Sequence, residues 1–143
     1  MILAPLLGLA DRLREKALAR TLPAAAVAGR RAENLAHRFL QKQGYTIVAR
    51  NWRPRAGAGE IDLIGWDHGA LAFIEVKSRS SEEFGSPDRA IDAAKRRDLA
   101  RVAAHYARRA GVPPGQMRFD VVNVVLTPDP QIDLKKDAFD PWR

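Results

Sequence analysis

The sequence predicts an α/β domain in which a mixed central sheet is flanked by helices. Helical and strand-like patterns follow one another in the order helix, three strands, helix, two strands. Two long helical segments among short strands favour helices that cover the faces of one sheet. The chain has 143 residues, of which 46% are hydrophobic, and this suffices for one domain with its own core.

The first 28 residues are expected to form an extension that precedes a domain of residues 29–143. Its leucines recur at helical spacing among basic residues, which predicts an amphipathic helix that either packs on the domain or contacts a partner or a membrane surface. Residues 21–28, which include Pro23, indicate a linker. The opening apolar stretch is too short for a secretory signal or a spanning helix. We therefore expect a cytoplasmic protein without stable membrane insertion.

Residues 29–59 predict a helix, a strand and a loop. The helix spans Gly29–Gln43, and Gly44 stands where helices commonly stop. The strand Tyr45–Trp52 leads into the basic loop 53–59. This loop is either a plain connection or a segment that wraps the backbone of a substrate.

The next two strands form a predicted hairpin. Gly59–Ile64 and Leu71–Lys77 are rich in β-branched and aromatic residues, and the turn Trp66–Gly69 separates them. Acidic residues and a lysine stand within these apolar strands. A charge in such a place is costly unless it is paired or bound to a metal.

A long helix is predicted from Pro87 to about Arg109, because proline favours the first turn of a helix. A polar loop, Ser78–Pro87, precedes it, and the glycines and prolines of Gly111–Gly115 end it. Arginines and a lysine crowd the part of this helix that its apolar residues leave free. That part is either a solvated face or a face that binds a polyanion.

Two more strands complete the predicted sheet. Met117–Leu126 is strongly apolar and indicates a buried strand, although it contains the acid Asp120. Ile132–Leu134 indicates a short last strand. Phe139 and Trp142 are expected to anchor the tail of the chain on the domain.

The charge balance favours an acidic partner. Lys and Arg number 24 against 17 Asp and Glu, which gives a net charge of +7. Such a surface favours nucleic acid, although an arginine-rich composition would account for the charge equally well. The chain has no cysteine, which excludes disulfides, thiolate zinc sites and cysteine nucleophiles.

Asp62, Glu75 and Lys77 form the strongest chemical pattern. Side chains alternate along a strand, so Glu75 and Lys77 share one face, and Asp62 comes beside Glu75 if the register of the hairpin allows it. Two adjacent carboxylates repel each other unless a cation lies between them. They suit Mg²⁺ or Mn²⁺, and a lysine beside the ion can orient or deprotonate an attacking water. Glu60 shares the face of Asp62 and is a second candidate acid.

A simpler interpretation of the same residues stays open. Exposed acids and same-face ion pairs are ordinary on the wet side of an antiparallel sheet. The position of Asp62 and Glu75 within apolar strands favours the metal site over this interpretation.

The sequence resembles the PD-(D/E)-x-K nuclease superfamily and, more closely, the YraN-type family of bacterial proteins, which are similar to archaeal Holliday junction resolvases. The resemblance covers about residues 29–139, and Ile61 stands where the superfamily pattern has proline. The matching pieces are Gly29–Glu33, Gly59–Ile64, Phe73–Arg79, Phe84–Gly85, Lys95 and Arg118–Val122.

This resemblance implies a restriction-endonuclease-like fold and metal-dependent hydrolysis of DNA phosphodiester bonds, with branched or junction DNA as one candidate substrate. Asp62 and Glu75 would then hold the metal together with the carbonyl of Val76, and Lys77 would position the water. Glu33 would complete the site, whereas its position alone indicates only an acid that favours the helix dipole.

Partners follow from the same comparison. Junction resolvases act as dimers, so by analogy we expect a homodimer. The basic residues expected to contact nucleic acid are Arg30, Arg31, Arg53, Arg55, Arg79, Lys95 and Arg96.

Two other functions are compatible with the sequence. A non-catalytic nucleic-acid-binding protein would keep the fold and the basic faces, and a structural domain would use those faces to bind acidic proteins. The joint presence of Asp62, Glu75 and Lys77 favours the enzyme, because binding alone does not require a carboxylate pair facing a phosphate.

Overall fold

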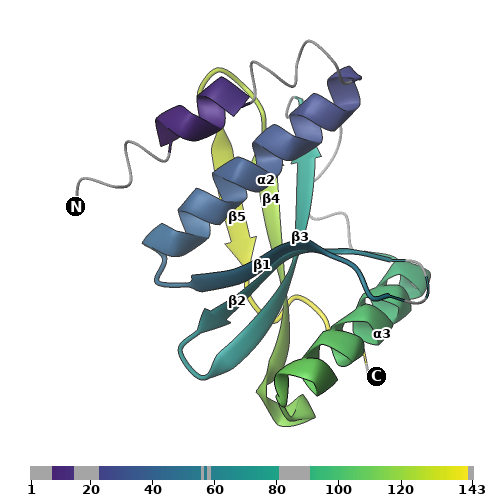
Figure 1. Ribbon diagram of the computed structural model, residues 1–143. Coiled ribbons are helices and arrows are strands. Elements are labelled where there is room, and N and C mark those ends of the chain that lie inside the picture. Colours follow the sequence, from purple (N-terminus) through teal and green to yellow (C-terminus); the bar gives the residue numbers. More distant parts are fainter. Residues whose placement is uncertain (1–7, 15–22, 56, 58, 81–90, 142–143) are drawn as a thin grey trace.

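A five-stranded mixed sheet forms the centre of the structure, a computed structural model that describes residues 8–14, 23–55, 57, 59–80 and 91–141 (Figure 1). β3 and β4 are parallel, and the other neighbouring strands are antiparallel. Helices cover both faces, which confirms the predicted α/β fold with a mixed central sheet. The strands, in their order across the sheet, are β1 (Thr46–Trp52), β2 (Ile61–Asp67), β3 (Ala70–Arg79), β4 (Met117–Val125) and β5 (Gln131–Lys135).

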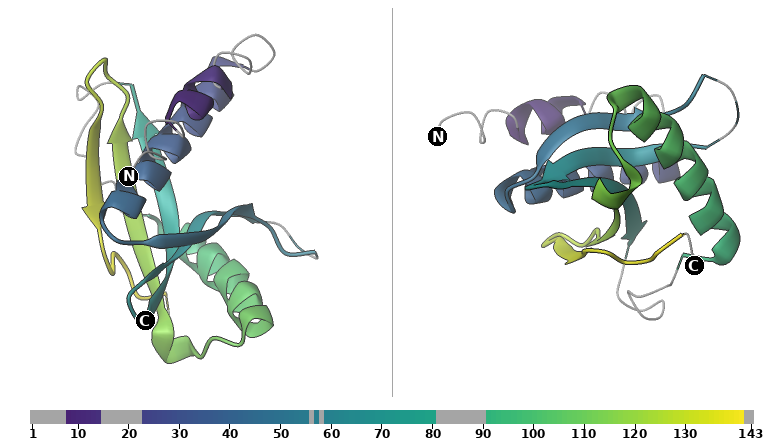
Figure 2. Two further views of the ribbon diagram at one scale, coloured as in Figure 1. Left: turned by 60° about the vertical axis from the view of Figure 1, so that its left-hand side comes forward. Right: turned by 90° about the horizontal axis from the view of Figure 1, so that it is seen from below.

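Helix α2 (Ala24–Lys42) lies on one face of the sheet (Figure 2). It buries Ala32, Ala36 and Leu40, which are four residues apart and therefore share one side of the helix. They pack with side chains of β2, β3 and β4. Among these side chains, Leu63 of β2 is fully buried. This contact forms the first of two hydrophobic cores.

Helix α3 (Ala93–Ala110) lies on the opposite face and forms the second core. Leu99 and Val102 of α3 pack with Phe73 and Phe119 of the sheet. A short 3-10 helix, η1 (Pro114–Gln116), follows α3 and leads into β4. No helix in the described part of the chain is long and apolar enough to cross a membrane.

Two helix boundaries differ from those that the sequence predicts. α2 begins at Ala24, so residues 24–28 are helical and do not form a linker; their alanines are strong helix formers. α3 begins at Ala93, where the side chain of Asp92 accepts a hydrogen bond from the backbone N–H of Lys95 at 2.8 Å. The predicted start at Pro87 lies outside the described residues.

Three strands are longer than the sequence predicts, and β5 exceeds its predicted range by one residue at each end. β2 includes Trp66 and Asp67, which leaves only His68 and Gly69 in the turn. β3 continues through Ser78 and Arg79, because β4 pairs with both residues. The tail follows the prediction in part: the ring of Phe139 stacks on that of Phe119, with centroids 5.1 Å apart, and Trp142 lies outside the described residues.

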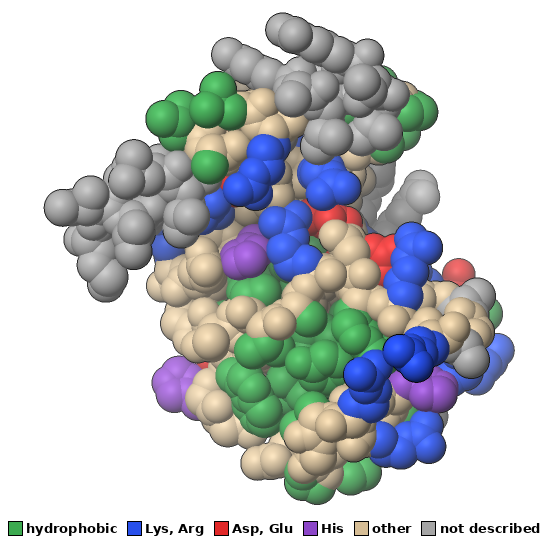
Figure 3. Space-filling model, viewed as in Figure 1, with side chains coloured by type: hydrophobic (Ala, Val, Ile, Leu, Met, Phe, Trp, Pro, Cys, Tyr) green, Lys and Arg blue, Asp and Glu red, His purple; other side chains and the backbone are tan. Residues whose placement is uncertain are grey.

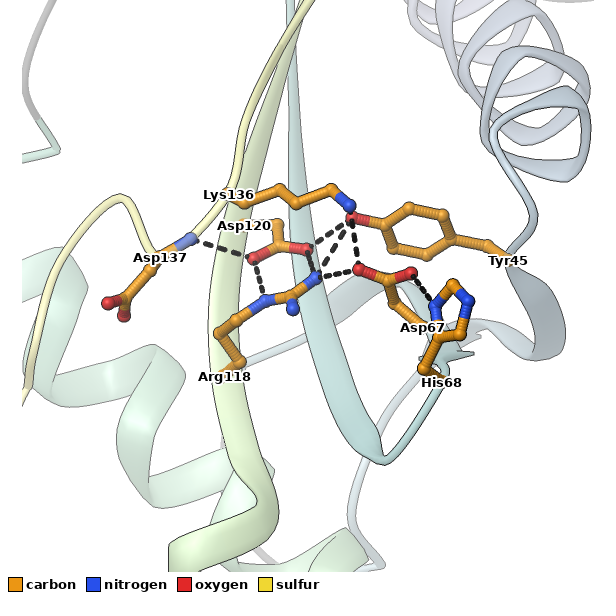
Figure 4. A network of polar contacts seen from close by, with 7 residues as sticks. All are labelled: Tyr45, Asp67, His68, Arg118, Asp120, Lys136 and Asp137. Atoms are coloured by element: carbon orange, nitrogen blue, oxygen red, sulfur yellow. Dashed lines mark hydrogen bonds and ion pairs between the residues drawn. The ribbon is translucent and has the colours of Figure 1, made fainter.

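Asp120, the acid within the apolar strand β4, is fully buried in a network of polar groups (Figure 4). Its carboxylate accepts hydrogen bonds from the Tyr45 hydroxyl at 2.7 Å and from Nε and Nη2 of Arg118 at 2.8 Å each. The backbone N–H of Asp137 adds a fourth hydrogen bond at 3.0 Å. The burial of this acid is therefore compensated by a full set of donors.

The same network holds the end of the β2–β3 hairpin. Asp67 accepts hydrogen bonds from Lys136 and Arg118, each at 2.8 Å, and these bonds hold the pKa of Asp67 well below its usual range. The hydrogen bond that Arg118 donates to Asp120 raises the pKa of Arg118 above its ordinary value. The network joins Tyr45, the residue before β1, to the hairpin, to β4 and to the segment after β5. It therefore gives a structural role to Asp120, whose role the sequence left open.

Candidate active site

The hairpin of β2 and β3 brings Asp62 beside Glu75. Leu63 pairs with Ile74, and one further step in the same register places Asp62 opposite Glu75. Ile74 points into the core under α2, so its neighbour Glu75 points to the face that carries α3. Asp62 lies at the start of β2, where its carboxylate also approaches Glu33 of α2. The backbone N–H of Val76 donates a hydrogen bond to Oδ2 of Asp62 at 2.8 Å. The structure thus brings together the two acids as the register argument expected.

The two carboxyl groups are unusually hard to ionise. Burial raises the pKa of Asp62 to about 7, and the charge of Glu75 adds to this effect. Burial also raises the pKa of Glu75, while Lys95, a hydrogen bond with Asp62 and Lys77 oppose the rise. Within the described residues, Oε2 of Glu75 is buried and has no hydrogen-bond partner. Such a pair is stabilised by sharing a proton or by binding a cation.

Two lysines approach the acid pair. Lys77 follows Glu75 by two residues on β3 and therefore shares its face, as predicted. Lys95, from the first turn of α3, places Nζ 3.7 Å from Oε1 of Glu75. Lys95 was expected to contact nucleic acid, and the structure places it at the carboxylates.

Glu33 and Glu60 meet Asp62 from its other side. Glu33 belongs to α2, and Glu60 is the residue before β2. Carboxylate oxygens of Glu33, Glu60 and Asp62 lie within 4.8 Å of one another. Their repulsion contributes to the raised pKa of Asp62. The structure therefore joins Glu33 to the site, where the family resemblance placed it.

Asn51 holds these acids together and was not found from the sequence. Its Nδ2 donates hydrogen bonds to Glu60 at 2.6 Å and to Glu33 at 3.1 Å. Asn51 has a φ of 49°, in the left-handed region that asparagine tolerates better than most residues. The available signal was an asparagine near the end of a predicted strand, where this residue type is disfavoured.

The acid pair predicts an unusual dependence of stability on pH. The pKa of an unfolded Asp is about 3.9, whereas that of Asp62 in the folded protein is about 7. Between these values the folded state binds more protons than the unfolded state, so the free energy of unfolding in EDTA should fall as the pH rises from about 5 to about 8. Asp67, with its lowered pKa, acts in the opposite direction but only at much more acid pH.

Thermal unfolding of the wild type and of Asp62→Asn checks this prediction. Mn²⁺ should raise the melting temperature of the wild type more at pH 8 than at pH 5, because it competes with protons for the carboxylates. The variant should lose the metal effect and show a smaller pH slope, to which the raised pKa of Glu75 still contributes. Asp133→Asn, at an exposed position on β5, is the matched control. Equal slopes in the wild type and Asp62→Asn would show that Asp62 ionises normally.

The other residues predicted to contact nucleic acid are distributed around this cluster. Arg30 and Arg55 are exposed, and Arg31 is half-buried on α2. Arg53 is exposed and forms an ion pair with Glu60 at 2.7 Å, so it adjoins the acids directly.

The two remaining predicted contacts differ from each other in their surroundings. Arg79 lies on the same face of β3 as Glu75, four residues further along. Arg96 instead serves packing: its Nε donates a hydrogen bond to the Ile91 carbonyl at 2.7 Å, and its guanidinium lies over the Phe139 ring at 5.7 Å. The structure therefore engages Arg96 within the protein, which leaves it a weaker candidate for a phosphate contact.

The fold and the site define an α/β protein with a largely buried carboxylate pair and adjacent lysines at the open end of a β-hairpin. The chain belongs to the uncharacterised protein family UPF0102, whose model matches residues 32–124. This match agrees with the closer of the two resemblances seen in the sequence. Glu33, Asp62, Glu75 and Lys77 all lie within the matched residues.

Relatives in several bacteria resemble most of the chain. A UPF0102 protein of Solibacter usitatus is 54% identical over 111 residues, which cover 78% of this chain and 84% of the relative. A UPF0102 protein of Koribacter versatilis is 49% identical over 112 residues, which cover 78% of each chain. A UPF0102 protein of Symbiobacterium thermophilum is 50% identical over 101 residues, which cover 71% of this chain and 84% of the relative.

Proposed function

We propose that the protein is a metal-dependent nuclease that hydrolyses phosphodiester bonds of DNA at the Asp62–Glu75 site. The observation that carries this proposal is the pair of facing, largely buried carboxylates with two lysines beside it. Two buried acids without a cation destabilise a fold. A surface that only binds nucleic acid has no need of acids at its centre.

The donor set suits a hard divalent ion such as Mg²⁺ or Mn²⁺. Asp62 and Glu75 would hold this ion, since Oε2 of Glu75 is without a partner among the described residues. The N–H and C=O of a strand residue point to the same edge, so the carbonyl of Val76 also faces β2 and is available as a ligand. Glu33 and Glu60 would accept hydrogen bonds from waters around the ion. A bound ion would polarise the scissile phosphate and lower the pKa of a water.

The lysines supply the positive charges that the reaction requires. Lys77 shares the face of Glu75 and would hold the attacking water and stabilise the charge that develops on the phosphate. Lys95 stands near Glu75 at the start of α3 and would contact the phosphate next to the one being cut.

Basic side chains beside the acids would bind the DNA backbone. Figure 3 shows Lys and Arg side chains on both sides of a small group of acidic side chains on this face. Arg97 and Arg101 are exposed on α3, and Arg55 is exposed in the loop before β2. This loop contacts α3, because a Cβ atom on Gly59 would lie 2.7 Å from Cγ2 of Val102. The loop and α3 therefore lie side by side, and the guanidinium of Arg101 lies against the loop.

The proposal extends to the fold family and to assembly. The mixed sheet, with the acids on its central hairpin, suits a restriction-endonuclease-like fold of the PD-(D/E)-x-K superfamily. A branched or junction DNA carries two strands to be cut, and a homodimer would supply two sites. Action on DNA would place the protein in the cytoplasm.

Incubation of the purified protein with labelled duplex, single-stranded and branched DNA tests the activity. We expect cleavage in Mg²⁺ or Mn²⁺ and none in EDTA. Glu75→Gln keeps the size of the side chain but removes a metal ligand, and it should lower the rate at least about a hundred-fold. Asp133→Asn removes an exposed acid and should cleave as the wild type does. Equal cleavage by both variants would assign the activity to another site or to a contaminant.

A non-catalytic nucleic-acid-binding protein is the second candidate, and the ion pairs of the site favour it. Lys95 approaches Glu75, and Arg53 pairs with Glu60, so the chain's own cations neutralise part of the acidic charge. Salt-sensitive DNA binding without cleavage in any metal would select this function. A protein that does not bind DNA at all would be assigned a structural role.

A further inference from the structure

A pocket of about 440 Å³ lies between the helical residues 8–14 and α2. Most of its lining comes from α2, and the rest comes from a segment outside the residues that match the family model. Its charged lining consists of Asp11 and Arg12 on one side and of Arg31, Arg38 and Lys42 on the other.

Positive charge exceeds negative charge in this pocket. Asp11 is already engaged, because it forms an ion pair with Arg38 and lies 3.8 Å from Arg14. Within the part of the chain that the structure describes, no ion pair involves Arg12 or Lys42, and both residues are exposed. The surplus of cations favours an anionic ligand.

Arg38 carries a second and independent indication. Its Nη2 donates a hydrogen bond to Asp11, while its Nε is buried and lacks an acceptor among the described residues. Buried donors in folded proteins almost always have a partner. An acceptor brought by a ligand would complete the hydrogen bonding of this guanidinium.

We propose that this pocket binds the phosphate group of a nucleotide-sized ligand. A guanidinium group can donate two parallel hydrogen bonds to two oxygens of one phosphate, and the ammonium group of a lysine adds a compact positive charge. The volume lies within the range of small-ligand sites. The phosphate belongs either to a free nucleotide or to a nucleic-acid strand, since both offer the same chemistry. This site is separate from the carboxylates, so it does not depend on the proposed nuclease activity.

Calorimetric titration of the full chain with pyrophosphate, in EDTA and at fixed ionic strength, tests the pocket. The wild type should bind saturably, and the double variant Arg12→Ala/Lys42→Ala should lose at least about ten-fold in affinity. Both residues are exposed, so their truncation leaves the core intact. Arg108→Ala/Arg109→Ala removes two exposed charges from the last turn of α3 and should stay within about two-fold of the wild type.

Competition with ATP and with a 5′-phosphorylated oligonucleotide distinguishes the two sources of phosphate. If ATP displaces pyrophosphate at a lower concentration than the oligonucleotide does, the ligand is a free nucleotide. If the oligonucleotide is the stronger competitor, the ligand is a nucleic-acid strand. Either result supports the pocket. Equal losses in the two double variants, or no saturable binding of pyrophosphate, would overturn the proposal. Because EDTA removes divalent ions, an inactive carboxylate cluster would leave these outcomes unchanged.

Discussion

Replacement of Lys77 by alanine is expected to lower the rate of metal-dependent DNA cleavage on the order of a thousand-fold. Lys77 shares the face of Glu75 and contributes to the electrostatic field at its carboxylate. Its side chain is half-buried near the end of β3, outside both hydrophobic cores, so the variant should fold. Single-turnover cleavage measures the chemical step, and DNA affinity in EDTA should change only a few-fold.

Two further variants make this prediction specific. Lys77→Arg keeps the positive charge but cannot give up a proton, so partial activity would indicate charge stabilisation, and full loss would indicate proton transfer or water positioning. Lys135→Ala removes an exposed lysine from β5 and should cleave at the wild-type rate. A wild-type rate in Lys77→Ala would remove this lysine from the proposed mechanism.

Replacement of Asp120 by alanine is expected to lower the free energy of unfolding by about 3–5 kcal/mol. The carboxylate is fully buried and accepts hydrogen bonds from Tyr45, Arg118 and the backbone of Asp137. Its loss leaves the guanidinium of Arg118 and the Tyr45 hydroxyl short of an acceptor. Chemical denaturation should show a lower midpoint with an unchanged slope.

The matched control for this prediction is Asp133→Ala, which removes an exposed acid from the neighbouring strand β5. Its free energy of unfolding should stay within about 0.5 kcal/mol of the wild type. A loss below about 1 kcal/mol in Asp120→Ala would show that the polar network of Figure 4 contributes little to stability.

The fold class could be predicted because its signals are local. Strand alternation, the turn residues between 64 and 71 and the helical spacing of apolar residues each involve neighbours in the chain. The ends of elements were predicted less well, since they depend on pairing and capping. β3 runs to Arg79 only because β4 lies beside it, and α3 starts where Asp92 caps it.

By itself, the sequence determined that Glu75 and Lys77 share a face and that a hairpin could bring Asp62 opposite Glu75, because strand period and a short turn fix both relations. Only the tertiary structure decided that Asn51 joins Glu33 of α2 to Glu60, and that residues 8–14 close a basic pocket against α2. These contacts join segments far apart in the chain. Their geometry depends on how the helices pack on the sheet, which no local pattern of residues encodes.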